Sequence, residues 1–253
     1  MGTQRGAVGR GVLAAGLGAF VMGGCAGGTR SAPMAESGFL FRTVDGGDGP
    51  RRTVLYVPRG LDRSVPAPCI VFLHGSGECG TDGLRQLAQG LAPAMVAAPE
   101  AWPFVAVFPQ LETSEIQWAD REGLVLAALA DARGECAIDP DRIYLTGLSR
   151  GGAGTWAIAA RHPGVFAAAA PICGYGDPAT VAAPLAAMPI WAFHGLADDV
   201  VKPEKTTAIV EAIRAAGGTP KMTLYPGVDH GSWDRAYRTE GLGEWFLAHR
   251  RAR

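Results

Sequence analysis

The sequence lacks an excess of charge of either sign. Its 253 residues carry 23 Lys and Arg against 24 Asp and Glu, and no run of basic residues interrupts this balance. Proteins that bind nucleic acid present a basic patch that neutralises phosphates, so we expect no nucleic-acid partner. The length and the apolar fraction of 48% suit one packed domain with a sizeable core.

Cysteine pairs with the spacing of a metal site are also missing. None of the five cysteines lies in a Cys-x-x-Cys pattern or at ligand spacing from a histidine, so no metal site is expected. Four cysteines follow the N-terminal region: Cys69, Cys79, Cys136 and Cys173. In an oxidising compartment they permit three disulfide pairings, and a role as small buried hydrophobes is the alternative for Cys69 and Cys173.

The apolar stretch near the N-terminus, which follows Arg5 and Arg10, is too short to span a bilayer as a stable helix. The stretch Gly11–Gly24 is uncharged and largely apolar, and a positive start before such a stretch is typical of an export signal. It ends in Met22-Gly23-Gly24-Cys25, and small residues before a cysteine resemble the lipobox of bacterial lipoproteins.

We therefore predict that residues 1–25 form a lipoprotein-type signal peptide, with lipidation at Cys25 anchoring the exported protein to a bacterial membrane. A secretory signal cut near Ala26 and a disordered tail are the alternatives. Residues 26–37 are small and polar and predict a flexible tether. Residues 38–253 remain for the folded domain.

Strand-like and helix-like segments alternate along this domain. Phe39–Val44 and Arg52–Val57, joined by a Gly- and Asp-rich turn, predict an antiparallel hairpin. Buried strands are predicted at Cys69–Leu73, Phe104–Phe108, Arg142–Thr146, Phe166–Ile172, Pro189–Phe193 and Lys221–Tyr225. Helices are predicted over Leu84–Met95, ended or kinked by Pro93, and over Trp118–Ala132, Gly152–His162, Pro203–Ala216 and Glu240–Arg250. The fold class is therefore α/β, a mostly parallel sheet with helices on both faces, whose ligands bind at the carboxyl ends of the strands.

One motif lies at such a strand end. Gly147-Leu148-Ser149-Arg150-Gly151 follows a predicted strand and precedes a predicted helix, which is the context of a nucleophile elbow. The glycines allow the strand and helix backbones to approach closely, and the helix N-terminus faces the serine with free N–H groups. Ser149 is the candidate nucleophile.

A serine nucleophile needs a base and an acid that orients the base. His230 lies in a glycine-flanked loop after the last strand, where it can act as the base. Asp198 follows the preceding strand in the run His-Gly-x-x-Asp, and Asp199 is the alternative acid. The order Ser149, Asp198, His230 is that of an α/β-hydrolase triad. His74 and His194, each in a strand-end His-Gly pair, are expected to orient loops.

An oxyanion site needs backbone N–H donors near the nucleophile. The N–H of Arg150 is one candidate and the N–H of Ser76 the other, with Gly75 allowing the Ser76 loop to approach the substrate. Trp118 and Trp233 are candidates for the substrate pocket, and a role as core or rim aromatics is the alternative.

Several stretches together resemble α/β-hydrolases of the phospholipase/carboxylesterase and polyhydroxybutyrate-depolymerase-like esterase group, related to the catalytic domain of prolyl oligopeptidases. The resemblance rests on His74–Gly80, Asp139–Gly152, Phe166–Gly174, Phe193–Asp198 and His230–Trp233. It implies an α/β-hydrolase catalytic domain over residues 38–253 that hydrolyses esters through an acyl-enzyme without a cofactor. Cys79 stands where members of the group commonly carry Arg.

The predicted function is a serine esterase. The segment Gly174–Ala187 is too short for a large lid, which favours an open site for short-chain, aryl or polymer-end esters. A serine peptidase of the prolyl-oligopeptidase type and a non-catalytic surface binding module are the alternatives.

Overall fold

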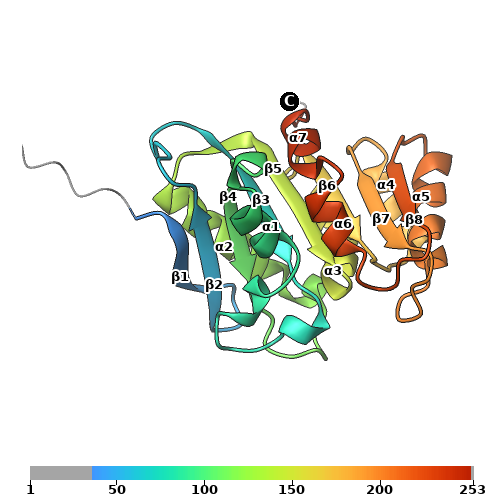
Figure 1. Cartoon of the computed structure of the whole chain (residues 1–253), viewed down its shortest axis with the longest axis horizontal. Helices are drawn as coiled ribbons and strands as arrows, with labels where there is room; N and C mark the ends of the chain where they lie inside the picture. Colours follow the sequence, from blue (N-terminus) through green and yellow to red (C-terminus); the bar gives the residue numbers. More distant parts are fainter. Residues whose placement is uncertain (1–35, 252–253) are drawn as a thin grey trace, which may run out of the picture. The chain divides into compact units, whose positions relative to one another are not determined.

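The computed structural model describes residues 36–251, which build an eight-stranded sheet (Figure 1). The spatial order is β1-β2-β4-β3-β5-β6-β7-β8. The strands are β1 (Gly38–Asp45), β2 (Pro50–Val57), β3 (Ala67–Leu73), β4 (Val105–Pro109), β5 (Ile138–Leu148), β6 (Ala168–Ile172), β7 (Trp191–Gly195) and β8 (Lys221–Tyr225). Strand β2 pairs antiparallel with β1 and β4, and every other pair is parallel. The predicted fold class, with its antiparallel N-terminal hairpin, is confirmed.

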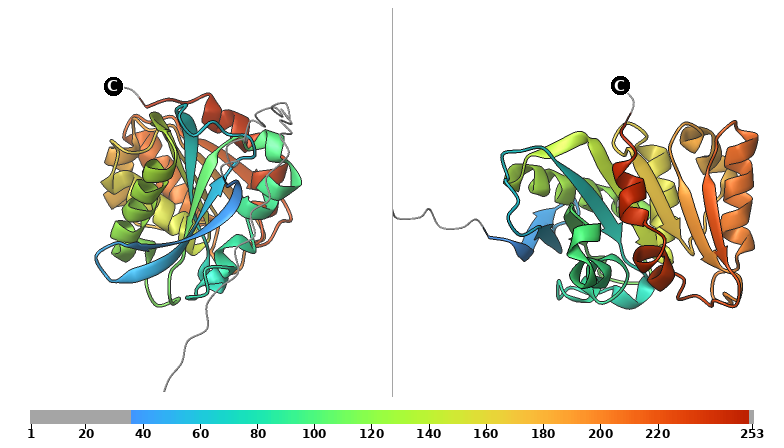
Figure 2. Two further views of the ribbon diagram at one scale, coloured as in Figure 1. Left: turned by 90° about the vertical axis from the view of Figure 1, so that its left-hand side faces the viewer. Right: turned by 45° about the horizontal axis from the view of Figure 1, so that its top comes forward.

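Helices cover both faces of this sheet (Figures 1 and 2). One face carries α2 (Glu122–Glu135), α3 (Arg150–Arg161), α4 (Pro178–Leu185) and α5 (Glu204–Ala215), and the other carries α1 (Leu91–Ala97), α6 (Trp233–Arg238) and α7 (Leu242–Leu247). Short 3₁₀ turns lie at Ser76–Glu78, Arg85–Leu87, Pro99–Ala101 and Trp118–Arg121. Within residues 36–251, no helix has the length and hydrophobicity needed to cross a bilayer.

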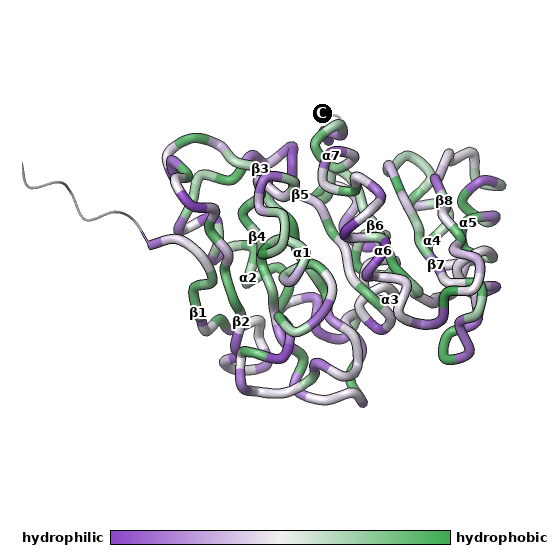
Figure 3. The backbone as a smooth tube through the Cα atoms, viewed as in Figure 1, coloured by the Kyte–Doolittle hydropathy of each residue, from purple (hydrophilic) through white to green (hydrophobic). Residues whose placement is uncertain are grey.

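The side chains of β3 show how the sheet joins two cores. Successive side chains of a strand point to opposite faces. Cys69 and Val71 therefore pack with the helices of one face, and Ile70 and Phe72 pack with those of the other. Hydrophobic stretches follow the strands, and hydrophilic segments gather in the connections (Figure 3). Burial on both faces explains why the central strands read as continuous apolar runs.

The predicted helix over Leu84–Met95 is wrong. The chain forms a 3₁₀ turn at Arg85–Leu87 and then α1, separated by Gly90. Gly90 has φ 71°, and a Cβ there would lie 2.8 Å from Leu148 Cδ2, so the backbone breaks where it packs on the core. Pro93 stands in the first turn of α1, where no N–H is needed.

Two further helices lie where the sequence predicted none. The stretch Gly174–Ala187 contains α4, which Asp177 caps by accepting a hydrogen bond from the Ala179 N–H. The loop after His230 continues into α6, and the predicted closing helix is reduced to α7. The four cysteines among the described residues are free thiols, and Cys69 and Cys173 are buried. The predicted signal peptide, Cys25 and most of the tether lie outside the described residues.

Candidate active site

Ser149 alone forms the turn between β5 and α3. Its backbone lies at φ 54° and ψ −114°, a strained conformation for a residue with a side chain. A Cβ on Gly151 would lie 1.8 Å from the Leu73 carbonyl oxygen, and one on Gly147 would lie 2.5 Å from the Gly151 oxygen. Both glycines are therefore needed for the crossing of strand and helix, which holds the serine at the carboxyl edge of the sheet.

The fold brings Ser149, His230 and Asp198 together from three loops. Ser149 Oγ lies 2.9 Å from His230 Nε2, and His230 Nδ1 lies 2.7 Å from Asp198 Oδ2. Because an ionised carboxylate only accepts hydrogen bonds, Nδ1 carries the proton, and Nε2 is left to accept from the serine hydroxyl. Asp199 is exposed, and it is Asp198 whose carboxylate reaches His230.

The Asp198 carboxylate is buried but fully hydrogen-bonded. Its Oδ1 accepts from the N–H groups of Val200 and Val201, both at 2.9 Å. Burial opposes the charge, but the hydrogen bonds from His230 and from the Val201 N–H outweigh it and hold the pKa of Asp198 below its usual value. Asp198 is therefore a fixed negative charge beside His230 at neutral pH.

His194 also reaches this carboxylate, a role that the sequence interpretation missed. Its side chain is fully buried, and Nε2 lies 3.1 Å from Asp198 Oδ2 and 2.8 Å from the Val201 oxygen. Since both partners only accept, Nε2 carries the proton, and Nδ1 can accept from the Thr206 hydroxyl at 2.8 Å. Burial lowers the pKa of His194, so the ring is a neutral donor to Asp198. The spacing of four residues between His194 and Asp198 was no clear signal, since His74 and Glu78 have the same spacing.

The candidate oxyanion donors belong to the turn after β3 and to the first residue of α3. Among the described residues, the backbone N–H groups of Ser76 and Arg150 have no hydrogen-bond acceptor. The Arg150 guanidinium donates to Ser76 Oγ at 2.9 Å and to the Ile116 oxygen at 3.0 Å. One side chain thus ties the elbow to the loop after β3.

Gly75 allows close packing of the loop, but its N–H is not free to bind an oxyanion. Its N–H donates to Glu78 Oε2 at 2.9 Å, and a Cβ there would lie 2.8 Å from Leu148 Cδ1. Burial raises the pKa of Glu78 despite this hydrogen bond. The carboxyl group therefore folds back on its own turn and fixes the backbone that presents Ser76.

The two candidate pocket tryptophans differ in position. Trp118 is fully buried; its Nε1 donates to the His74 oxygen at 3.0 Å, and its ring meets the His74 ring edge-on. The prediction that Trp118 lines the pocket is therefore wrong: it supports the loop after β3 from the core. Trp233 is half-buried, and its ring lies edge-on to His230 with centroids 5.5 Å apart, so it borders the site.

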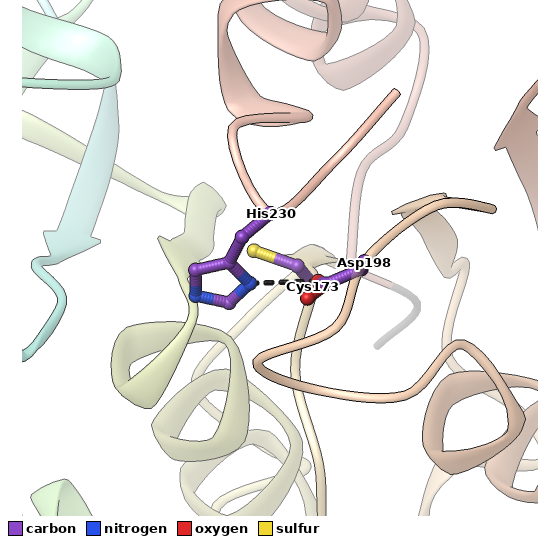
Figure 4. Close-up of side chains that lie close together, drawn as sticks. All are labelled: Cys173, Asp198 and His230. Atoms are coloured by element: carbon purple, nitrogen blue, oxygen red, sulfur yellow. Dashed lines mark hydrogen bonds and ion pairs between the residues drawn. The ribbon is translucent and has the colours of Figure 1, made fainter. Parts of the chain in front are cut away.

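Cys173 lies beside the same residues (Figure 4). Ligand-type atoms of Cys173, Asp198 and His230 lie within 4.8 Å of one another, which is close enough for a shared metal ion. However, His230 Nδ1 and Asp198 Oδ2 already share a hydrogen bond, and burial raises the pKa of the Cys173 thiol to about 12. A metal would need a thiolate and a free imidazole nitrogen, so the donor set does not fit one.

The chain is similar to several known proteins over part or most of its length. A poly(3-hydroxyalkanoate) depolymerase C from Paucimonas lemoignei is 33% identical over 133 residues, covering 47% of this chain and 30% of that protein. A probable carboxylesterase from Oryza sativa subsp. japonica is 28% identical over 233 residues, covering 77% of this chain and 86% of the relative. The crystal structure of a thermostable esterase is 32% identical with a TM-score of 0.71, covering 84% of this chain and 63% of that one. The chain thus spans less than two thirds of the depolymerase and of the thermostable esterase.

The family match covers the part of the chain that contains Ser149, Asp198 and His230. The model of the dienelactone hydrolase family matches residues 107–240, more than half of the chain. This range includes Ser149, Asp198 and His230, and it begins after Ser76. The predicted resemblance to carboxylesterases and depolymerases is confirmed by these relatives. With an eight-stranded α/β-hydrolase sheet and a family match across its centre, the chain belongs to the dienelactone hydrolase family.

Proposed function

We propose that the protein is a serine esterase that hydrolyses carboxylic esters through a covalent acyl-enzyme. The observation that carries the proposal is the continuous hydrogen-bonded row from the Ser149 hydroxyl through His230 to the Asp198 carboxylate. A hydroxyl is a weak nucleophile until an adjacent base, held by a third group, removes its proton. The carboxylesterase and esterase relatives support an ester as the substrate.

In the proposed acylation step, Ser149 Oγ attacks the ester carbonyl while its proton passes to His230 Nε2. Asp198 keeps Nδ1–H of His230 in place and stabilises the charged imidazolium. His230 then gives the proton to the departing alcohol as the C–O bond of the ester breaks. In deacylation, water gives a proton to His230 and attacks the acyl group, and the proton returns to Ser149 as the acid leaves.

The N–H groups of Ser76 and Arg150 are the proposed donors to the tetrahedral oxyanion. Their lack of acceptors among the described residues and the Arg150–Ser76 side-chain contact support this assignment. Donors that are already oriented toward the developing charge need no reorganisation during the reaction. Removal of one such donor typically costs about 100- to 1000-fold in rate.

The proposed substrates are short, soluble or aryl esters, or the ends of polyester chains. Helix α4, which lies in the segment between β6 and β7, packs against α3 and α5. It forms part of the helical layer, which supports a site without a large lid. The depolymerase relative supports polymer ends as one source of such esters.

The test is hydrolysis of a p-nitrophenyl ester series from acetate to palmitate by the wild type and by Ser149→Ala. We expect activity that falls with chain length in the wild type. In the variant we expect a loss of about 10⁴- to 10⁶-fold in kcat, because the nucleophile is gone. Circular dichroism checks that the variant is folded.

Two results would contradict the proposal. Equal activity in Ser149→Ala and the wild type would remove Ser149 from the reaction. Cleavage of peptide substrates by a folded wild type that hydrolyses no ester would replace the esterase with a serine peptidase.

A further inference from the structure

A cavity of about 370 Å³ lies beside the Asp198 loop and has no role in the chemistry described above. It is lined by Tyr175, Gly176, Val200, Val201, Lys202 and Lys205. The first two residues follow β6 and the other four follow β7. The cavity is therefore formed by the segment after β6, the loop after β7 and the first turn of α5, at the carboxyl edge of the sheet that also carries Ser149.

Residues that line the cavity also contact the candidate active site. The N–H groups of Val200 and Val201 hold the Asp198 carboxylate, and Tyr175 stands two residues after Cys173, which lies beside His230. Strands β6 and β7 are the first and second neighbours of β5 on this side. With neighbouring strands about 4.8 Å apart, the segments that follow β6 and β7 begin roughly 5 and 10 Å along the sheet from β5, the strand that precedes Ser149.

Lysine is rare in this chain, yet two lysines line this cavity. The sequence contains three lysines, and two of them, Lys202 and Lys205, line the cavity. Both are exposed, and neither forms an ion pair with a carboxylate among residues 36–251. The third, Lys221, lies over the Trp191 ring at 3.3 Å from its centroid.

Two other lining residues, Val200 and Tyr175, add apolar surface to the cavity. Val200 is 69% exposed, so its side chain presents apolar surface to a ligand. Tyr175 is half-buried, and its hydroxyl donates to Gln117 Oε1 at 3.2 Å, which holds the ring in place. The cavity thus offers an apolar wall together with two unpaired ammonium groups.

We propose that this cavity binds the carboxylate end of an ester substrate, so that the preferred substrates are short esters that carry a free carboxylate. The proposal rests on the esterase function proposed above. Val200 and the Tyr175 ring would contact the hydrocarbon part of the substrate, and Lys202 and Lys205 would bind the carboxylate by charge-assisted hydrogen bonds. Oligomers of hydroxy acids and half-esters of dicarboxylic acids have this chemistry.

The experiment compares esters that differ in one charge. p-Nitrophenyl pentanoate and mono-p-nitrophenyl glutarate place a methyl group or a carboxylate at the end of acyl chains of equal length. Phenyl pentanoate and 4-carboxyphenyl pentanoate make the same comparison on the alcohol side. The proteins are the wild type, the double variant Lys202→Gln/Lys205→Gln, and Lys221→Gln as a matched control that removes a lysine outside the cavity.

We expect the double variant to lower the ratio of kcat/KM for the carboxylated ester to that for its neutral partner by about tenfold in at least one pair. The change should lie in KM, and 0.5 M NaCl should weaken it in the wild type because salt screens exposed charges. Lys221→Gln should keep the wild-type ratio. The pair that responds identifies the side of the ester that enters the cavity.

The outcomes separate this inference from the proposed function. Hydrolysis of the neutral esters with an unchanged ratio in both pairs would overturn the carboxylate site and leave the esterase intact. Equal losses in Lys221→Gln and in the double variant would also overturn it, since the effect would then be one of overall charge. Failure of the folded wild type to hydrolyse any of the four esters would overturn the esterase function, and the inference with it.

Discussion

Strands β3 and β7 both run into a turn of the pattern His-Gly-x-x-acid, and the two turns use the pattern differently. After β3 the residues are His74-Gly-Ser-Gly-Glu78, and after β7 they are His194-Gly-Leu-Ala-Asp198. Both histidines are fully buried, and both acids are buried. The structure nevertheless gives the two carboxyl groups opposite shifts in pKa.

In the turn after β3, His74 and Glu78 form hydrogen bonds within the turn and with Leu111 and Gln89. His74 Nδ1 donates to the Gly75 oxygen at 2.6 Å, and its Nε2 accepts from the Leu111 N–H at 3.0 Å. Burial lowers the pKa of His74 to about 4, so the ring stays neutral. Glu78 accepts from the Gly75 N–H and from Gln89 Nε2. These hydrogen bonds hold the turn and leave both side chains unconnected to Ser149.

The turn after β7 is built around its acid. Asp198 accepts from two backbone N–H groups and from two imidazole rings, those of His194 and His230. The shorter side chain of Asp keeps the carboxylate at the centre of the turn, where these four donors converge. Glu78 has one more methylene group and reaches back to Gly75 instead. The donors around a buried carboxyl group, and not the sequence pattern, therefore set the direction of its pKa shift.

The largest expected difference between the turns is in activity. We expect Asp198→Asn to lower kcat by about 10⁴-fold, because an amide cannot stabilise the imidazolium and favours the wrong His230 tautomer. Glu78→Gln should lower kcat by less than about tenfold, since the amide oxygen can still accept from the Gly75 N–H. Steady-state kinetics with p-nitrophenyl butyrate measures both.

The control for Asp198→Asn is Asp199→Asn, which makes the same chemical change at the exposed neighbour. Its kinetics should match those of the wild type. A loss of equal size at both positions would mean that the charge of the loop, and not the contact with His230, matters for the reaction.

A smaller difference is expected between the two histidines. His194→Phe removes a donor to the Asp198 carboxylate, and we expect kcat to fall by roughly 10- to 100-fold with little change in KM, since a hydrogen bond to a charged group is worth about 1.5–3 kcal/mol. His74→Phe leaves the Leu111 N–H without its acceptor and the Gly75 oxygen with only the long contact from Cys79 Sγ at 4.0 Å. It should mainly lower the free energy of unfolding, by about 2–4 kcal/mol. Kinetics and urea unfolding of both variants test this.

His194→Gln separates positioning from packing, because its side-chain amide retains a donor. It should recover part of the kcat lost in His194→Phe. If His194→Phe loses stability but keeps the wild-type kcat, His194 holds the fold and does not position Asp198.

The smallest effect expected is the pH dependence of stability, which should have opposite signs in the two turns. The pKa of Asp198 is lower in the folded protein, so its contribution is present above the unfolded value of 3.8 and is lost as the pH falls through the folded pKa. The pKa of Glu78 is raised, so the folded protein retains its proton above 4.5, and stability is lost as the pH rises from there through the folded pKa.

Relative to the wild type, Asp198→Asn should therefore be most destabilising at neutral pH and less so near pH 3, and Glu78→Gln should gain in relative stability between pH 4 and 7. Each change should follow the direction of the pKa shift of the carboxyl group that is replaced. Urea unfolding at pH 3.5, 5 and 7 measures it. The same sign in both variants would remove the contrast between the turns.

Much of the fold could be predicted from the sequence because its strands are buried on both faces. Burial makes β3, β4 and β7 continuous apolar runs, and their order with the helices indicates a parallel sheet. The break at Gly90 could not be predicted, because it depends on contact with Phe72 and Leu148. Helix α4 was missed because a Pro- and Ala-rich segment is typical of a loop, although Asp177 caps it and it packs on α3 and α5.

Some features of the candidate site could likewise be predicted from the sequence, and others could not. By itself, the sequence determined that a serine would stand on a sharp turn between strand and helix, because only glycine fits the close backbone approach at positions 147 and 151. It also placed the candidate acid and base at the ends of later strands, since parallel strands bring their carboxyl ends to one edge. Only the tertiary structure decided that His194 reaches Asp198, that Trp118 is buried and that Lys202 and Lys205 line a cavity. These features depend on distances between loops, which follow from packing and leave no periodic pattern in the chain.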